Sequence, residues 1–504
     1  MPMQRIFLTG LPGAGKTMVG HRAASLLGWR FLDTDEVLRQ RTGSSVEQVL
    51  ARYGAEHLSQ LEAEVLHELV RDERVVIAIG RNIAASEASS LFMRQHGLIA
   101  YVPEFPHLNS REEMWSSLAQ RLVSQALAQG YLSVPKVSRE IVRLPLKGTA
   151  SQAIIEWGGL PHLGSVLREQ DFPERLFVVT DNQIGDLFTP SIRTSLEEAG
   201  FKPYFMTIPE EEAYKSLECF KQLIDWLAEC RAERTEPILA IGGSVVGDIV
   251  GFVASSYLRG VPLVQVPTTL LAQVDSAIGG KTGVNHPLGK NVIGSYYQPE
   301  LIFVDPALML ILPERVYCEG WAEIVKYAMI LDADLFTLLE ERLSTLQARD
   351  PAQLSSIVAR CIRIKMSVVQ QDELDRGERH ILNYGHTFGH ALETVTNYET
   401  WLHGEAVAIG MEVAAHLAVA TGTLSQEEAR RQTRLLQALN LPIRCPGVDV
   451  QALMQAMQQD KKVTAGSIRW VLPTGIGHAE IYDHIDPAKI QEAIVEVCFG
   501  PSGE

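Results

Sequence analysis

The chain has 504 residues, which is more than one hydrophobic core usually serves, so two to four domains are expected. Hydrophobic residues make up 46% and charged residues 21%, the composition of an ordinary soluble globular protein. The net charge of −16 argues against a general nucleic-acid-binding protein, and an anionic substrate would need its own cluster of Lys and Arg.

The cysteines and the apolar runs indicate where such a chain works. The six cysteines lie far apart and include no CxxC pair, which is typical of a reducing cytosol. No apolar run reaches membrane-spanning length, and the N-terminus has no signal-peptide layout. We therefore expect a cytoplasmic enzyme with small-molecule substrates, and neither nucleic acid nor a membrane as partner.

The first region alternates short apolar runs with helical patterns, which predicts a parallel α/β sheet. A helical pattern also covers 110–129, and 144–153 is expected to be a linker. The expected strands are 5–10, 31–35, 75–80 and 98–102.

The second region alternates in the same way, and from about residue 313 long helical patterns dominate, with one late strand at 467–473. The expected strands of the second region are 175–181, 203–209, 237–243 and 263–269, and the main helices of the third are 352–371, 404–421 and 426–438. The predicted fold class is a multidomain α/β protein. Its expected parts are residues 1–145 (parallel sheet), 153–312 (second α/β domain) and 313–504 (mostly helical domain).

GLPGAGKT, residues 10–17, matches the P-loop pattern and follows an apolar strand, as that motif requires. Gly10, Gly13 and Gly15 would let backbone N–H groups converge on phosphate oxygens. Lys16 adds positive charge, and Thr17 can hold Mg²⁺. The alternative is a Gly-rich turn with an incidental lysine.

The P-loop, with LGWRFLDTDEVL (27–38) and RTGSSVEQVLARYGAEHLSQLEAEVL (41–66), resembles shikimate kinase over about the first hundred residues. The resemblance implies ATP and Mg²⁺, with Asp33 supporting the metal and Asp35 binding the shikimate hydroxyls. Without the resemblance, Asp33 is equally well explained as a helix cap.

The first region departs from that family at the acceptor side. Ser59 stands where the family has an Arg for the shikimate carboxylate, and Gly80-Arg81-Asn82 replaces a Gly triplet. Neither an Arg-Pro-Leu-Leu lid nor the last helix with its second Arg is recognised, although Arg81 is a candidate substitute. Two readings stay open: a shikimate kinase, and a non-catalytic nucleotide-binding module for regulation or assembly.

A second Gly-rich turn, GGSVVGD at 242–248, follows a strand and precedes a helical pattern. Such a turn lets a helix N-terminus approach a pyrophosphate, but Gly pairs in this place are common. A more specific signal is a set of charged and amide side chains in otherwise apolar or Gly-rich sequence. Its members are Arg259, Asp275, Lys281, Lys290 and Asn291.

Residues from about 153 to the end resemble 3-dehydroquinate synthase through long motifs in the family's order. These are PEEEAYKSL (209–217), GGSVVGD (242–248), VPTTLLAQVDSAIGGKTGVN (266–285), GKNVIGSYYQP (289–299), GWAEIVKYA (320–328), RHILNYGHTFGHALE (379–393), LHGEAVAIGM (402–411) and DKKVTAG (460–466).

This resemblance implies a bound NAD. The residues that would contact or flank it are Glu212, Lys215, Gly243, Asp248, Thr268, Thr269, Lys290 and Asn291. Two positions depart from the family: Ser244 stands for a third Gly, and Ile311 for a Thr whose hydroxyl contact is worth about 1 kcal/mol.

The resemblance also implies a metal site made of Glu323, His386 and His403, suited to Zn²⁺ or Co²⁺. His390, four residues after His386, would lie in the substrate site instead. Without the resemblance, two histidines four residues apart are more typical of helix capping or of side-chain pairing on a helix surface than of a metal site.

The implied reaction converts 3-deoxy-D-arabino-heptulosonate 7-phosphate into 3-dehydroquinate and phosphate, with NAD reduced and reoxidised in each turnover. Asp275 and Lys281 would polarise the oxidised alcohol with the metal, while Asn383 and His390 handle protons and contact phosphate. The cations for phosphate and carboxylate would be Arg259, Lys326, Lys365, Arg379 and one lysine of the 461–462 pair, here Lys461.

Two alternatives for this part are a metal-dependent polyol dehydrogenase of the same broad fold and another sugar-phosphate cyclase. The dehydrogenase would release NADH and would not need the phosphate-binding cations. A homodimer formed through the synthase-like part is expected.

Overall fold

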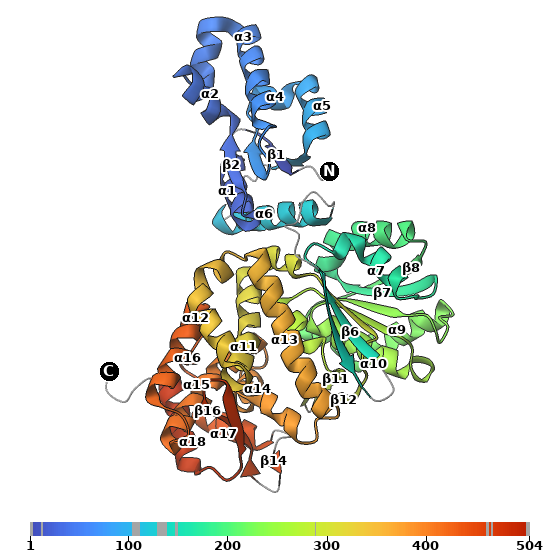
Figure 1. Ribbon diagram of the computed structural model, residues 1–504, viewed down its shortest axis with the longest axis vertical. Coiled ribbons are helices and arrows are strands. Elements are labelled where there is room, and N and C mark those ends of the chain that lie inside the picture. The colour runs from blue at the N-terminus through green and yellow to red at the C-terminus, as the bar shows by residue number, and fades with distance from the viewer. Residues whose placement is uncertain are drawn as a thin grey trace.

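The computed structural model describes residues 4–11, 14–102, 111–128, 139–146, 150–287, 289–459, 463–464 and 467–499. Two bodies stand end to end: an N-terminal part up to residue 128, and a larger C-terminal part from residue 139 (Figure 1). Helix α6 (Arg111–Ala128) runs across the junction between them.

The N-terminal part is built on a parallel sheet with strand order β2-β3-β1-β4. Alternate residues of β1 face opposite sides: Ile6 and Leu8 pack with α1, and Phe7 packs with α3. The predicted strands are confirmed within two residues at their ends. The strands are β1 (Arg5–Thr9), β2 (Arg30–Asp33), β3 (Val75–Ala78) and β4 (Leu98–Tyr101), and the helices are α1 (Lys16–Leu27), α2 (Thr34–Thr42), α3 (Val46–Leu69), α4 (Arg81–Ala85) and α5 (Glu87–His96).

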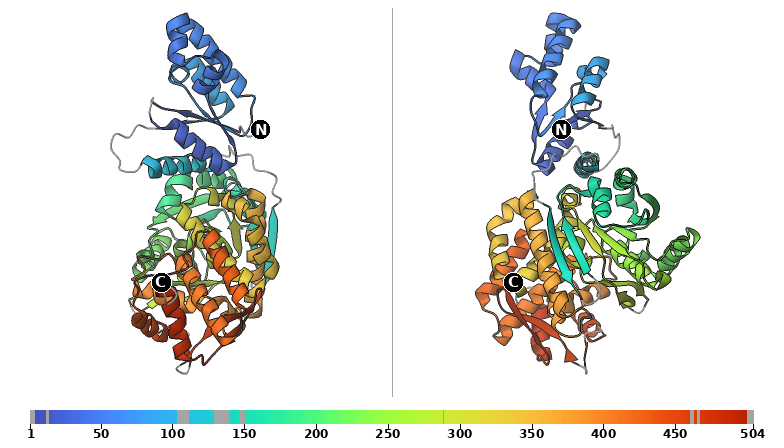
Figure 2. Two further views of the ribbon diagram at one scale, coloured as in Figure 1. Left: turned by 90° about the vertical axis from the view of Figure 1, so that its left-hand side faces the viewer. Right: turned by 45° about the vertical axis from the view of Figure 1, so that its right-hand side comes forward.

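Helix α6, predicted at 110–129, packs on α1 with one face and on the C-terminal part with another. Figure 2 shows it lying between the two bodies in both further views. Its Ala119, Val123 and Ala126 are fully buried, so the junction is apolar at its centre.

The linker expected at 144–153 is wrong for most of its length. β5 (Glu140–Pro145) pairs antiparallel with β6 (Ala150–Ile155), and β6 in turn pairs with β13. Pro145 and Gly148 are typical of loops, but apolar residues on either side of them find partners in the sheet of the C-terminal part.

That sheet has seven strands in the order β5-β6-β13-β10-β9-β7-β8. The chain leaves β7 toward β8 on one side and then crosses to β9 on the other, so the switch point lies between β7 and β9, where ligands of such sheets bind. The other strands are β7 (Arg175–Asp181), β8 (Lys202–Ile208), β9 (Ile238–Gly242), β10 (Leu263–Pro267) and β13 (Leu301–Val304). The helices are α7 (Leu163–Glu169), α8 (Asn182–Glu198), α9 (Leu217–Glu229) and α10 (Ser244–Ser256).

A connecting segment, residues 305–313, leads from β13 to the helical region and contains the short helix η5 (Pro306–Leu310). The Asp305 carboxylate holds the start of the connecting segment in place. It accepts hydrogen bonds of 2.7 to 2.9 Å from the backbone N–H groups of Gly158, Leu160 and Ala307. Before β13, a hairpin of β11 (Lys281–His286) and β12 (Gly289–Tyr296) reaches toward the helices.

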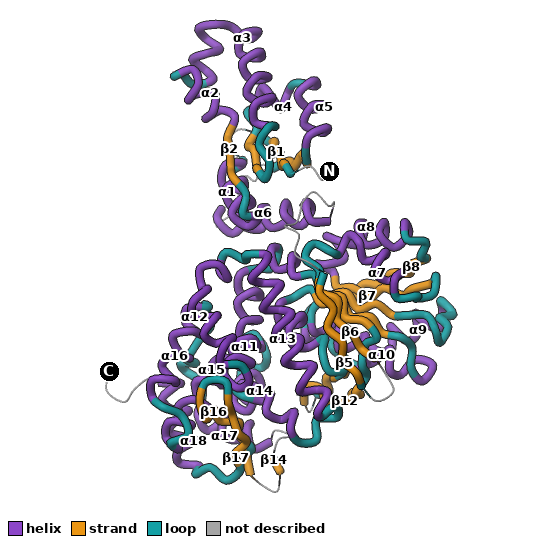
Figure 3. The backbone as a smooth tube through the Cα atoms, in the orientation of Figure 1, coloured by secondary structure: helices purple, strands orange, loops and turns teal. Residues whose placement is uncertain are grey.

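The helical region confirms the predicted long helices and places the late strand at 470–475 (Figure 3). α15 is apolar on all sides and long enough to span a membrane, but 72% of that window is buried inside the protein, as in a core helix. The helices are α11 (Glu314–Leu331), α12 (Ala333–Gln347), α13 (Pro351–Gln371), α14 (His386–Val395), α15 (His403–Thr421), α16 (Gln426–Ala438), α17 (Val450–Gln459) and α18 (Pro487–Phe499). The strands are β14 (Val463–Thr464), β15 (Ser467–Ile468), β16 (Trp470–Gly475) and β17 (His478–Tyr482).

Candidate active site

Three side chains from three helices converge on one point in the helical region. Glu323 lies on α11, while His386 and His403 are the first residues of α14 and α15. Glu323 Oε1 is 3.4 Å from His386 Nε2 and 4.0 Å from His403 Nε2. The structure therefore brings together the three residues expected to hold a metal.

The chemistry of these donors fits a divalent cation. Glu323 is 0% exposed, and neither of its carboxylate oxygens accepts a hydrogen bond from the described residues, although the Lys326 ammonium contacts one of them. The Lys326 ammonium offsets part of the cost of burying this charge, and a metal would satisfy the oxygen that faces the two imidazoles. One carboxylate and two imidazoles with an open position suit Zn²⁺ or Co²⁺.

The two imidazoles are oriented for this role by their other nitrogens. His386 Nδ1 lies 3.0 Å from the Tyr384 carbonyl oxygen, and His403 Nδ1 lies 3.3 Å from Glu393 Oε2. Each ring therefore turns Nε2 toward Glu323, the arrangement by which outer groups orient metal-binding histidines. Sequence reasoning assigned Glu393 no role; its signal was its place one turn after His390.

His390 lies beside the metal cluster. Its ring centroid is 5.5 Å from that of His386 and 5.9 Å from that of His403. Nitrogen and oxygen atoms of His390, Glu393 and His403 also lie within 4.8 Å of one another, so these residues border the same space.

A second cluster surrounds Asp275, which lies on a π-helical turn at 272–276. Asp275 Oδ1 accepts from Lys365 Nζ at 2.7 Å and from the Tyr327 hydroxyl at 2.5 Å, and Lys326 Nζ lies 3.9 Å away. Burial opposes ionisation of Asp275, but Lys365 and Lys326 outweigh it and lower the pKa of this carboxyl. Burial lowers the pKa of Lys365 to about 8, although Asp275 acts in the other direction.

Arg379 is buried against the turn that follows the Asp275 cluster. Its Nη1 donates to the carbonyl oxygens of Gly279 at 2.9 Å and Glu373 at 3.0 Å. Gly279 has φ +90°, and a Cβ at this position would collide with Arg379 Nη2. The turn at 279 therefore requires glycine both for its backbone conformation and for the guanidinium.

Lys281 is the first residue of β11. Its ammonium pairs with Asp375, which precedes η6 (Glu378–Asn383), and no described contact joins it to Asp275. The reason is that β11 carries Lys281 away from the π-helical turn and toward the segment after α13.

Three other expected residues are not joined to these clusters by a described contact. Arg259 is exposed at the end of η3 (Tyr257–Arg259), and Asn383 is half-buried at the end of η6. Lys461 lies outside the described residues.

The expected cofactor site lies at the switch point of the seven-stranded sheet. Gly243 precedes the first residue of α10 at the end of β9, and Asp181 ends the neighbouring strand β7. A Cβ on Gly242 would lie 2.9 Å from Asp181 Oδ2, so this carboxylate borders the Gly-rich turn. Burial raises the pKa of Asp181 to about 6. Sequence reasoning missed Asp181, although its signal was an acidic residue at a strand end.

A polar network connects the cofactor side to the metal side. Lys290 Nζ lies 3.5 Å from Glu212 Oε1 and 3.1 Å from Glu393 Oε1. One ammonium therefore links the residues expected to bind NAD with those around the metal site. Asn285, which was not predicted, donates from Nδ2 to Glu212 Oε1 at 2.8 Å. It also accepts from the Asn291 N–H at 2.9 Å.

The remaining expected cofactor residues lie around the same turn. Lys215 Nζ and Asp248 Oδ2 form an ion pair of 2.5 Å. The Thr268 N–H donates to the Gly242 carbonyl at 3.0 Å, and Thr269 Oγ1 accepts from the Ala272 N–H at 3.1 Å. The turn is therefore held by backbone and hydroxyl contacts.

The described part of the P-loop leads directly into helix α1. Gly15 has φ +90°, and α1 starts at Lys16, so the helix N-terminus points at the loop. Lys16 Nζ donates to the carbonyl oxygens of Gly10 at 2.9 Å and Leu11 at 3.1 Å, and Thr17 Oγ1 donates to Asp33 Oδ2 at 3.1 Å. Gly13 lies outside the described residues.

The acceptor side of this domain is acidic. Asp35 lies against Gly80, and the buried Glu62 accepts from Asn82 Nδ2 at 3.2 Å. Burial raises the pKa of Asp35 and of Glu62, with Asp33 adding to the effect on Asp35. Ser59 is exposed, and the side chain of Arg81 lies outside the described atoms.

Comparison with known protein families gives three matches along the chain. The family described as shikimate kinase matches residues 12–114. The families described as 3-dehydroquinate synthase N-terminal and C-terminal match residues 205–319 and 320–463.

Individual relatives agree with the two later matches. The chain is 45% identical over 332 residues to the 3-dehydroquinate synthase of Desulforamulus reducens, covering 66% of this chain and 92% of that one. It is 43% identical over 357 residues to the 3-dehydroquinate synthase of Nostoc punctiforme, covering 70% and 98%.

Two solved structures resemble the C-terminal part. The 2-epi-5-epi-valiolone synthase of Streptomyces hygroscopicus, with NAD⁺ and Zn²⁺ bound, has a TM-score of 0.65 at 29% identity, covering 70% of this chain and 98% of that one. A 2-deoxy-scyllo-inosose synthase complexed with carbaglucose-6-phosphate, NAD⁺ and Co²⁺ has a TM-score of 0.65 at 25% identity, covering 71% and 100%.

Proposed function

Because the chain belongs to the 3-dehydroquinate synthase family and carries a shikimate kinase domain ahead of it, we propose that its C-terminal part converts 3-deoxy-D-arabino-heptulosonate 7-phosphate into 3-dehydroquinate and phosphate. The observation that carries this proposal is the buried Glu323 carboxylate facing His386 and His403, next to the Lys326–Lys365–Asp275 cluster. Such a site combines a metal position with desolvated cations for an anionic substrate.

Each set of residues has a task in this reaction. Glu323, His386 and His403 would hold Zn²⁺ or Co²⁺, and the Gly243 turn with Lys215, Asp248 and Lys290 would hold NAD. When bound, the metal polarises the substrate alcohol and NAD accepts and returns hydride.

The substrate's phosphate and carboxylate are the groups that need cations. Lys326, Lys365 and Arg379 are at most 5% exposed, so their charges are poorly solvated and attract anions strongly. His390, beside the metal ligands, is placed to move a proton at the reacting carbons. We assign Asn383 and Lys461 to phosphate contact and Lys281, Arg259 and Asp275 to substrate orientation.

The two alternative functions of the C-terminal part are a polyol dehydrogenase and another sugar-phosphate cyclase. A polyol dehydrogenase would not need three buried cations beside the metal site. The two cyclases of other specificity described above are 29% and 25% identical to this chain, against 45% for the 3-dehydroquinate synthase of Desulforamulus reducens.

The test is an assay of the full-length chain with the heptulosonate phosphate, NAD and Zn²⁺. Phosphate release that requires metal and NAD, without accumulation of NADH, supports the proposal. NADH formed in step with substrate consumption contradicts it and favours the dehydrogenase.

For the N-terminal domain we propose binding of Mg·ATP, with Lys16 on the phosphates and Thr17 and Asp33 on Mg²⁺. Shikimate phosphorylation is the second candidate, favoured by Asp35 at the acceptor side. With Glu62 nearby and Ser59 in place of an Arg, that side has little to attract a carboxylate.

Replacing Ser59 with Arg tests the acceptor directly. A charge-assisted hydrogen bond of about 1.5–3 kcal/mol predicts roughly a 10- to 100-fold gain in shikimate-dependent ATP turnover. Gln60→Arg, at the neighbouring exposed position, is the matched control. If shikimate stimulates ATP turnover in neither the wild type nor Ser59→Arg, while both still bind nucleotide, nucleotide binding remains as the function of the domain.

We infer a homodimer through the synthase part, supported by exposed apolar side chains at Leu258, Val292 and Tyr296. We also place the protein in the cytoplasm, in keeping with its six unpaired cysteines. Functionally we divide the chain into the P-loop unit through α6, the NAD-binding unit from β5 to residue 312 and the metal-binding unit from residue 313.

A further inference from the structure

We propose that nucleotide binding at the P-loop alters the synthase through helix α6, which touches the P-loop at one end and the connecting segment 305–313 on its other face. The N-terminal domain would thus regulate the enzyme to which it is fused. This inference rests on the proposed nucleotide and NAD sites.

The first link is the contact between α6 and the P-loop itself. The Trp115 indole lies so close to Gly15 that a Cβ at Gly15 would collide with its Nε1 and lie 2.9 Å from Cε2. Gly15 directly precedes Lys16, the residue that would bind phosphate. A change in the loop backbone at Gly15 therefore has to move the indole or be resisted by it.

The P-loop also has a reason to change. Lys16 Nζ is bound to the Gly10 and Leu11 carbonyl oxygens of its own loop. Phosphates compete for this ammonium and for the loop N–H groups, so binding rearranges the hydrogen bonds of the loop against which Trp115 packs.

The second link is the apolar packing of α6. Ala119, Val123 and Ala126 are fully buried and share one cluster with Val19 and Ala23 of α1. The same cluster continues into the C-terminal part without interruption. Close-packed side chains transmit displacement because they leave little room to absorb it.

The third link is a hydrogen bond to the connecting segment. Gln120 Nε2, on α6, donates to the Leu312 carbonyl oxygen at 3.2 Å. Arg349, after α12, donates to the same carbonyl at 3.3 Å and to that of Met309 at 2.5 Å. Leu312 is thus held from both the N-terminal part and the helical region.

The connecting segment is well placed to affect catalysis. It starts at the end of β13, in the sheet that carries the NAD site, and ends at α11, which carries Glu323. Any rotation between the NAD-binding sheet and the metal-binding helices passes through these residues.

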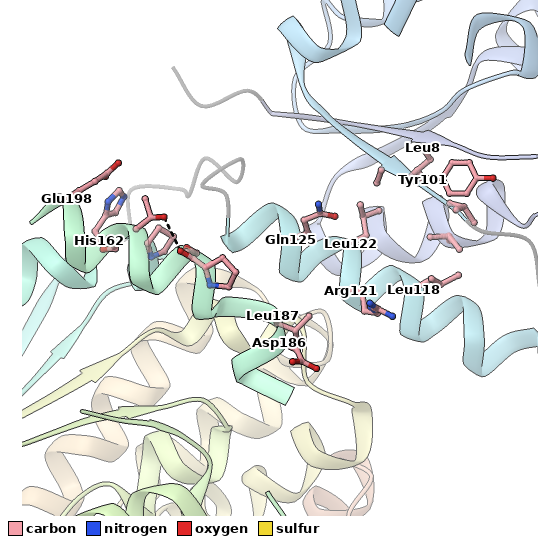
Figure 4. Close-up of a pocket in the computed structure, with 18 residues that line it drawn as sticks. Leu8, Tyr101, Leu118, Arg121, Leu122, Gln125, His162, Asp186, Leu187 and Glu198 are labelled. Carbon is pink, nitrogen blue, oxygen red and sulfur yellow. Dashed lines mark hydrogen bonds between the residues drawn. The ribbon is translucent and has the colours of Figure 1, made fainter. Parts of the chain in front are cut away.

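Space for movement lies beside α6. A cavity of about 900 Å³ is lined by residues of both parts, among them Leu118, Arg121 and Gln125 of α6 and Asp186 and Leu187 of α8. Figure 4 shows Arg121 on the side of α6 that faces Leu187 and Asp186, and Leu118 farther along the helix toward Tyr101. The cavity therefore borders α6 from both parts of the chain, with Val19 of α1 and Leu187 of α8 among its lining residues.

The coupling can be measured as a change in binding, since two linked sites alter each other's affinity by the same factor. In the full-length protein, the dissociation constant of NAD is measured by calorimetry with and without Mg²⁺ and AMP-PNP, a non-hydrolysable ATP analogue. The dissociation constant of Mg·AMP-PNP is then measured with and without NAD. We expect both to change by the same factor, about fivefold or more.

A matched pair of variants on α6 tests whether the coupling between the nucleotide and NAD sites passes through this helix. Gln120→Ala removes the donor to Leu312, whereas Gln125→Ala removes an exposed amide from the same helix. We expect Gln120→Ala to bind each ligand alone within twofold of wild type but to lose the mutual effect, and Gln125→Ala to keep it. Lys16→Ala should abolish nucleotide binding and with it the effect on NAD.

The outcomes separate this inference from the synthase activity. Equal NAD affinity with and without bound nucleotide, no nucleotide binding at all, or full coupling in Gln120→Ala would each overturn the inference, even if phosphate release were normal. Coupling between the two sites in a protein that releases no phosphate would instead contradict the proposed function.

Discussion

Lys365 is buried beside Asp275, and its charge state determines how strongly this cluster attracts an anion. Because burial lowers the pKa of Lys365 to about 8, we expect kcat/KM for the heptulosonate phosphate to fall as pH rises through 8. The unfolded chain holds this proton up to about pH 10.5, so between 8 and 10.5 the unfolded state binds more protons and Lys365 adds stability to the fold as pH rises.

A pH profile of the full-length enzyme from 6 to 10 checks this. The stability trend, followed by chemical unfolding at the same pH values, should run opposite to the activity. A kcat/KM that stays level up to pH 9.5 would show that Lys365 keeps its proton or does not contact the substrate.

Glu393 makes no expected contact with the metal but orients His403 and binds Lys290. We expect Glu393→Gln to weaken Zn²⁺ binding by roughly 10- to 100-fold, because the imidazole loses the carboxylate that fixes its orientation. Competition with a chromogenic chelator measures this without an activity assay. Glu399→Gln, at an exposed position after α14, is the control, and equal Zn²⁺ affinity in the two variants would remove Glu393 from the site.

At the scale of elements, the strands at 175–181 and 263–269 could be predicted because central parallel strands are continuous apolar runs. β5 and β6 could not, since β6 pairs with β13 about 150 residues later and the residues between β5 and β6 have the composition of a linker. The metal ligands could be predicted from motifs that place each at the start or middle of a helix. The partners Asp375 and Asn285 could not, because they depend on contacts between elements that sequence spacing does not reveal.

The turn after the π-helical segment is an element that depends on one glycine. We expect Gly279→Ala to displace Arg379, raise KM for the phosphate substrate and destabilise the fold by about 1–2 kcal/mol, because an alanine disfavours φ +90° and its Cβ collides with the guanidinium. Thermal unfolding and steady-state kinetics measure both effects. A Gly279→Ala protein that behaves like wild type in both measurements would contradict this assignment.

At the scale of the whole molecule, the metal site joins α11, α14 and α15 and should contribute to global stability. Without the ion, the buried Glu323 carboxylate keeps only the Lys326 ammonium as a partner and the three helices lose a shared ligand, so we expect the apo-protein to unfold at a lower temperature. Added Zn²⁺ should raise Tm in proportion to the logarithm of its concentration above Kd.

Calorimetric scans after chelation, with Zn²⁺, Co²⁺ or Mg²⁺ restored, make the measurement. Glu323→Gln should lose most of the response to Zn²⁺, since the amide is a weaker ligand. A Tm unchanged by chelation and by Zn²⁺ would show that these helices need no ion to pack.

The apolar cluster that runs from α1 and α6 into the C-terminal part makes the P-loop domain and the synthase part share a core. If the chain were divided between α6 and β5, each of the two polypeptides would expose an apolar surface that fits the other. The junction would then become a subunit interface. Two separate polypeptides would therefore have to be produced in matching amounts to keep these apolar faces covered.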